Sequence, residues 1–201
     1  MDEVVRRLET WLRENHPEAL AGLQAGLSDA EISKHEKKLG VTLPDGMRAL
    51  YRWRNGNSED SFEAIQHNRN LMPLEEAVER HEELAELAEA GEFDSEDWWH
   101  AAWVPFLHNG GGSLLVWDPK GSFPHAGGKP GQVLEFWNKD SDRDIVAPSF
   151  DAWLTSFVES LEAGLWKFDK EDGNVEEREG LEAFLAERLP GYPIEPIDRD
   201  D

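Results

Sequence analysis

The sequence contains no cysteine, no long hydrophobic run and few basic side chains. The absence of cysteine from all 201 residues excludes disulfide bonds, thiolate metal sites and a cysteine nucleophile. No apolar run approaches the ~18 residues needed to cross a bilayer, so we expect no membrane span. The opening residues MDEVVRRLETWL include acids and lack a cleavage site of small residues, so we expect no signal peptide. These observations favour a cytoplasmic protein.

Basic side chains are scarce relative to acidic ones. The chain has 20 Lys and Arg against 43 Asp and Glu, which gives a net charge of −23. Such a field repels a phosphate backbone, so we expect no direct binding of nucleic acid. The same charge accelerates encounter with a basic protein. The alternative is that the acidity only maintains solubility.

Recognisable catalytic and metal-binding motifs are also missing. The run Asn109-Gly110-Gly111-Gly112 lacks the Gly-Lys-Ser/Thr ending of a phosphate loop, so it predicts a hairpin turn. There is no Gly-x-Ser-x-Gly elbow, and the seven histidines never form a His-Glu-x-x-His pair. We therefore predict no catalytic residue, no metal and no cofactor. A remaining alternative is a hydrolase that uses a pair of carboxylates near Asp118.

A strong amphipathic pattern occupies residues 2–15 and predicts a helix that ends before Pro17. Its apolar face either docks on the rest of the chain or binds a second subunit. Residues 19–25 continue with a weak helical pattern.

Two short helices are expected next. Ser28 and Glu31 have the spacing of a capping box, and Gly40 stands where a left-handed residue ends a helix. Pro44 suits the first turn of the second helix, and Asn55-Gly56 ends it, since both residues tolerate positive φ. The expected buried stripe of this second helix is Met47, Leu50 and Tyr51.

The period of the pattern changes from helix to strand after the middle of the chain. Turn residues separate four short candidate strands: 103–107, 113–117, 132–137 and 144–147. Consecutive strands without intervening helices predict an antiparallel meander, and residues 62–66 could supply a fifth strand. A helix beginning at Ser149 would cover one face of the sheet. The predicted class is α+β, with an antiparallel or mixed sheet of about five strands packed against helices.

The densest negative charge is expected on a helix over residues 74–90 and on the loop that follows. Residues 75–97 contain eleven acids and one arginine, and Trp98-Trp99 come directly afterwards. If that segment is extended, its two rings point in opposite directions, so one would be an exposed anchor for a partner. The alternatives are an ordinary solvated helix face and burial of the tryptophans. The candidate partner-binding residues are Glu79, Glu82, Glu83, Glu86, Trp98, Trp99 and Asp118.

Several of these motifs together resemble the SUKH superfamily of bacterial toxin-immunity proteins and fungal cell-wall-assembly regulators. The capping box is followed by Leu-Gly-Val-x-Leu-Pro at residues 39–44 and by the closing Asn55-Gly56. Trp103-Val104-Pro105 and Trp117-Asp118-Pro119 continue the resemblance, which extends over residues 27–166. The family often has an aspartate at the position of Asp118, where an Asx-turn is the competing structural role.

The resemblance implies a single α+β domain that binds protein and is not an enzyme. The first hypothesis is an immunity-type protein that neutralises a cognate basic toxin domain through its acidic surface. The alternative is an intracellular regulatory scaffold similar to the fungal proteins. We expect a helical extension at residues 1–25, the SUKH-like domain at 26–167, and an acidic linker, a short helix and a proline-rich tail at 168–201. The oligomeric state is left open.

Overall fold

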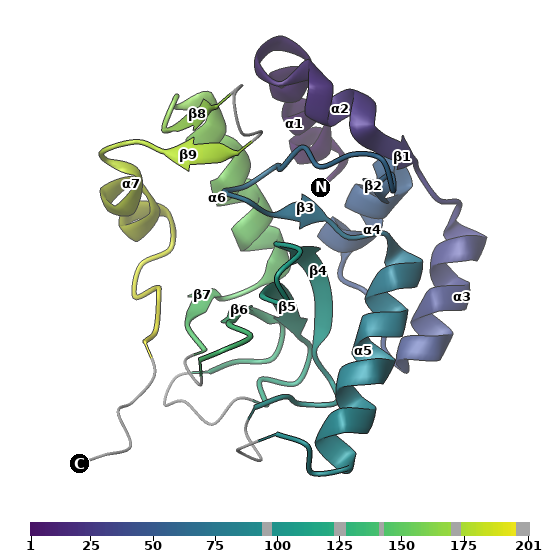
Figure 1. Cartoon of the computed structure of the whole chain (residues 1–201). Coiled ribbons are helices and arrows are strands. Elements are labelled where there is room, and N and C mark those ends of the chain that lie inside the picture. Colours follow the sequence, from purple (N-terminus) through teal and green to yellow (C-terminus); the bar gives the residue numbers. More distant parts are fainter. Residues whose placement is uncertain (94–97, 123–127, 141–142, 170–173, 196–201) are drawn as a thin grey trace.

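The computed structural model describes residues 1–93, 98–122, 128–140, 143–169 and 174–195. Helices and strands alternate irregularly along the chain (Figure 1). Their order is α1 (Asp2–Asn15), α2 (Pro17–Gly22), β1 (Leu23–Ala25), α3 (Asp29–Leu39), α4 (Asp45–Trp53), β2 (Arg54–Asn57), β3 (Asn70–Leu71), α5 (Leu74–Glu89), β4 (Val104–His108), β5 (Leu114–Asp118), β6 (Gln132–Phe136), β7 (Ile145–Ala147), α6 (Phe150–Glu162), β8 (Trp166–Phe168), β9 (Val175–Glu177) and α7 (Leu181–Arg188).

The main sheet has five strands in the order β3-β4-β5-β6-β7, and all its pairs are antiparallel. This confirms the predicted class and the predicted meander, with α5 packed beside β4 and α6 packed across β6 and β7. The turn between β4 and β5 is the glycine run. There the Asn109 side-chain oxygen accepts the backbone N–H groups of Gly111 and Ser113 at 2.9 and 3.1 Å. The sequence prediction of a hairpin turn is correct.

The fifth strand is not where the sequence predicted it. It is β3, whereas residues 62–66 contribute only one isolated bridge, between Gln66 and Arg69. The side chain of Asn57 explains the difference, because it donates to the Glu63 carbonyl at 3.0 Å and accepts the Leu71 N–H at 2.9 Å. This asparagine therefore ties the irregular segment to β2 and leaves β3 to pair with β4.

The helix pair follows the sequence prediction closely. Ser28 and Glu31 form the capping box of α3, and Gly40 ends that helix with φ 68°. Pro44 precedes α4, whose expected stripe of Met47, Leu50 and Tyr51 is buried.

The end of α4 differs from the prediction, because the chain passes directly into β2 and only Gly56 has positive φ there, at 75°. Asn55 is extended and buried, and its amide accepts the Leu74 N–H at 2.9 Å. Strand β2 pairs with β1, a strand that the weak helical pattern of residues 19–25 did not predict.

Both ends of the described chain pack on the same hydrophobic core as the sheet. Helix α1 buries Val5, Leu8 and Leu12 and lies against α4 and α6, so its apolar face is used within the chain. At the other end, Trp166 and Leu181 belong to that core too. In Figure 1 the segment from β8 to α7 lies on the side of α6 away from α5. None of the described helices is long and apolar enough to cross a membrane.

Candidate protein-binding site

The outer face of α5 carries the four glutamates that the sequence singled out. Glu79, Glu82, Glu83 and Glu86 are all exposed. They recur at intervals of three and four residues, which places them side by side on a helix. Arg80 is the only Lys or Arg of α5 and it pairs with Glu83 at 2.8 Å, so the other three glutamates have no ion pair within the helix.

The opposite face of α5 holds the helix against the sheet. Its buried residues include Ala77, Val78 and Leu84, which recur at helical spacing along one side of the helix. His81 is 8% exposed, and its Nδ1 lies 2.8 Å from the Trp103 carbonyl oxygen. The histidine is thus a buried residue whose Nδ1 has a hydrogen-bond partner.

The two adjacent tryptophans have different environments. Trp99 is 3% exposed and meets the rings of Trp103 and Phe136 edge-on, with centroids 5.5 and 5.3 Å away. It is part of the core, which corrects its prediction as a partner-binding residue. Trp98 is half-buried, with the guanidinium carbon of Arg143 5.0 Å from its ring centroid. Residues 94–97, which carry part of the expected acidic loop, lie outside the described residues.

Asp118 is also inside the protein. It is fully buried and accepts the N–H groups of Lys120 and Ser122 at 3.1 and 2.7 Å. The Ser122 hydroxyl and the Gln132 side-chain amide donate to it as well, both at 3.0 Å. The Asx-turn expected as its structural role is present. Its burial keeps its carboxylate from direct contact with a partner, which corrects its prediction as a partner-binding residue.

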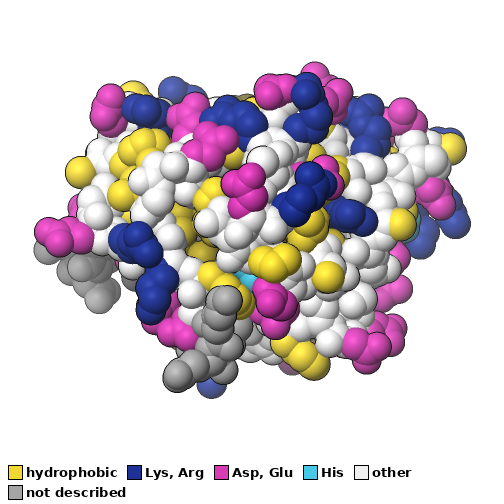
Figure 2. Space-filling view, turned by 90° about the horizontal axis from the view of Figure 1, so that it is seen from above, with side chains coloured by type: hydrophobic (Ala, Val, Ile, Leu, Met, Phe, Trp, Pro, Cys, Tyr) yellow, Lys and Arg dark blue, Asp and Glu magenta, His cyan; other side chains and the backbone are white. Residues whose placement is uncertain are grey.

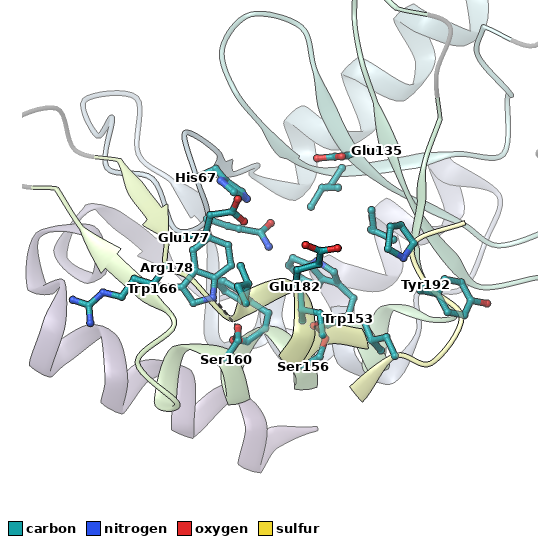
Figure 3. Close-up of a pocket in the computed structure, with 18 of the residues that line it drawn as sticks. His67, Glu135, Trp153, Ser156, Ser160, Trp166, Glu177, Arg178, Glu182 and Tyr192 are labelled. Carbon is teal, nitrogen blue, oxygen red and sulfur yellow. Dashed lines mark hydrogen bonds between the residues drawn. The ribbon is translucent and has the colours of Figure 1, made fainter. Parts of the chain in front are cut away.

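A cavity of about 720 Å³ between the sheet, α6 and the segment from β9 to Pro193 was not predicted from the sequence (Figure 3). We call it the C-terminal cavity. Trp153, Phe157 and Trp166 form aromatic walls, and Trp166 donates its indole N–H to the Ser160 hydroxyl at 2.7 Å. The polar lining residues come from distant parts of the chain: Gln66, His67, Arg69, Glu135, Ser156, Glu177, Arg178, Glu179 and Glu182.

The charges in the C-terminal cavity are mostly negative. Arg69 is 6% exposed and forms an ion pair with Glu135, so these two charges neutralise each other. Burial, and to a lesser extent Arg69, lower the pKa of His67, which favours its neutral form at pH 7. Arg178 points away from the cavity in Figure 3 and donates to the Gly164 carbonyl at 3.4 Å. The carboxylates of Glu177 and Glu182 therefore dominate the field at the opening.

The surface is not uniformly acidic. On the face seen from above in Figure 2, Lys and Arg side chains stand among the Asp and Glu side chains, and hydrophobic side chains reach the surface between them. This face carries no extended patch of one sign. No group of three or more His, Asp or Glu among the described residues could hold a metal ion. The two features that stand out are therefore the carboxylate face of α5 and the C-terminal cavity.

Comparison with known proteins matches the chain to one family. The sequence pattern of the SMI1 / KNR4 family (SUKH-1) matches residues 26–156, about two thirds of the chain. The cell wall biosynthesis/cell cycle regulator smi1 of Schizosaccharomyces pombe is 25% identical over 87% of this chain and 39% of its own length. The glucan synthesis regulatory protein of Neurospora crassa is 23% identical over 92% of this chain and 42% of its own.

A third relative, the cell wall assembly regulator SMI1 of Saccharomyces cerevisiae, is 19% identical over 94% of this chain and 46% of its own length. These three relatives are named as regulators and not as enzymes. The chain spans less than half the length of each. The alignments cover more of the chain than the family pattern does, so they extend into the segments outside residues 26–156.

Proposed function

The chain belongs to the SMI1 / KNR4 family (SUKH-1), and on that premise we propose that it is a non-catalytic regulator that binds another protein through the carboxylate face of α5. The observation that carries the proposal is the exposed set Glu79, Glu82, Glu83 and Glu86, opposed by a single arginine on the same helix. Such a face suits a partner with a basic surface and speeds its encounter. A cytoplasmic location remains part of the proposal.

The rigidity of α5 supports its use as a docking surface. The apolar face of the helix is buried, and Asn55 bonds both to the Leu74 N–H and to the Glu75 carboxylate, at 2.9 and 2.8 Å. A partner therefore meets carboxylates on a helix that is already fixed, which keeps the entropic cost of binding low.

A regulatory role has more support than the toxin neutralisation that the sequence first suggested. The three relatives described above are named as regulators of the cell wall, of the cell cycle or of glucan synthesis. Toxin neutralisation has only the acidic surface in its favour, because a carboxylate-rich face can imitate nucleic acid toward a basic nuclease. We therefore propose the regulatory role for this chain and treat a toxin partner as an outcome that the following experiment would reveal.

The test compares two variants of equal charge change. The first neutralises the α5 face (E79Q/E82Q/E83Q/E86Q), and the control neutralises four exposed acids on other elements (E14Q/E18Q/E59Q/D60N). Each tagged protein is used to capture partners from a host lysate, and the captured proteins are quantified by mass spectrometry at low and at physiological salt.

We expect at least one basic protein whose recovery falls severalfold with the α5 variant, remains with the control and decreases as salt rises. Identical capture by the wild type and both variants would rule out α5 as the docking surface. A secreted toxin encoded beside the gene, captured in the same α5-dependent way, would replace the regulatory role with immunity.

A further inference from the structure

We propose that the C-terminal cavity binds an arginine or lysine side chain carried on an extended segment of a partner protein. This site is separate from α5, and it rests on the proposed function only in taking the ligand to be part of a protein. The cavity lies where the segment from β9 to Pro193 folds over α6 and over one face of the sheet, where β5, β6 and β7 contribute to its lining.

The charge of the lining favours a cation. Glu177, Glu179 and Glu182 line the opening and form no ion pair with any described residue. In Figure 3, Glu177 and Glu182 lie on either side of the space next to Trp166. The arginines do not compensate for them, because Arg69 is held by Glu135 and Arg178 is turned away. A cation entering this space would meet the carboxylates of Glu177 and Glu182, neither of which forms an ion pair with a described residue.

The walls suit a long, partly apolar side chain. A volume of about 720 Å³ is in the range of pockets that hold small ligands or single side chains with adjoining backbone. Trp153, Phe157 and Leu185 offer apolar surface for the methylene stem of arginine or lysine.

Two buried polar atoms support a peptide over a simple cation. The Nε of Arg69 and the side-chain oxygen of Gln66 are buried and lack a hydrogen-bond partner among the described residues. Both side chains line the cavity, and Arg69 is only 6% exposed. Buried polar groups are nearly always paired in folded proteins. A peptide offers both complements, since its carbonyl oxygens accept from Nε and its N–H groups donate to the amide oxygen.

The experiment uses a defined probe and matched variants. The probe is a blocked alanine pentapeptide with a central arginine, and the control peptide carries citrulline, the neutral analogue of arginine, at the same place. Binding is measured from amide shifts in NMR titrations of the full chain. The variant E177Q/E182Q removes two carboxylates from the cavity. The control E176Q/E187Q removes two exposed carboxylates of β9 and α7 that do not line it.

We expect shifts at the residues that line the cavity, and binding of the arginine peptide about tenfold weaker in E177Q/E182Q but within about twofold of wild type in E176Q/E187Q. The citrulline peptide should bind more weakly to the wild type and should not distinguish the variants. Equal affinity for the two peptides, equal effects of the two variants, or shifts confined to α5 would overturn the proposal.

The two proposals fail independently. None of the four α5 glutamates lines the cavity, so a negative peptide titration would leave the α5 surface untouched. Conversely, a lysate experiment that shows no role for α5 would not alter the binding of the arginine peptide.

Discussion

Replacement of Asp118 by alanine is expected to lower the free energy of unfolding by about 3 to 5 kcal/mol. The carboxylate is fully buried and accepts hydrogen bonds from Lys120, Ser122 and Gln132. Alanine leaves four donor groups without an acceptor. A buried donor without a partner costs about 1 to 3 kcal/mol, and those of the loop can recover part of this cost from water.

The asparagine variant should lie between alanine and the wild type. An amide keeps the shape of the carboxylate but replaces one acceptor oxygen with an NH₂ group. Each oxygen of Asp118 accepts two bonds, so in either orientation the NH₂ group of the variant faces two of the former donors. We expect D118N to lose about 1 to 3 kcal/mol.

Urea denaturation at pH 7, followed by circular dichroism, measures both losses. For a chain of this size each kcal/mol lowers Tm by about 2 to 4 °C, so D118A should melt at least about 6 °C below the wild type. The matched control is Asp60, which is exposed, and D60A and D60N should each stay within about 0.5 kcal/mol of wild type. A D118A variant within about 1 kcal/mol of wild type, or D118N less stable than D118A, would refute the reasoning.

Three further predictions concern stability. Burial lowers the pKa of His16 in the folded chain, so below the ordinary histidine pKa of 6.5 the unfolded chain is protonated at His16 while the folded chain is not. The free energy of unfolding should therefore fall as pH drops below 6.5. Equal urea midpoints at pH 7.5 and 5 would contradict this, and H16Q should reduce the difference. Leu8 is 1% exposed on α1, so L8A should cost about 2 to 5 kcal/mol, whereas E14A, at an exposed position of the same helix, should be neutral in the same denaturation assay. Asn57 accepts the N–H of Leu71, so N57A should cost about 1 to 3 kcal/mol and speed hydrogen exchange at that amide, and unchanged exchange would count against the tie between β2 and β3.

The local elements were largely predictable from the sequence because their signals are local. The capping box of Ser28 and Glu31, the left-handed Gly40 and the proline before α4 each act within a few residues. The same holds for the turn at Asn109, where one side chain bonds two amides of its own loop.

The short strands were less predictable. Strand β3 has two residues, too few to show an alternating pattern. It forms because β4 pairs with it through backbone hydrogen bonds and because the Asn57 side chain accepts the Leu71 N–H. Strand β1 likewise depends on its partner β2. In both cases the pairing partner lies about thirty residues or more along the chain.

The sequence by itself determined the α+β class, the acidic face of α5 and the family, because each rests on composition, periodicity or local motifs. Only the tertiary structure decided that Trp99 and Asp118 are buried. Trp98 and Trp99 are identical in type and adjacent in sequence, yet their environments differ because remote segments pack against one ring more than the other. The tertiary structure also decided the C-terminal cavity, whose walls combine Gln66, Glu135 and Trp153 with residues after position 166. Burial and proximity are properties of how distant segments pack against one another, and no pattern along the chain records that arrangement.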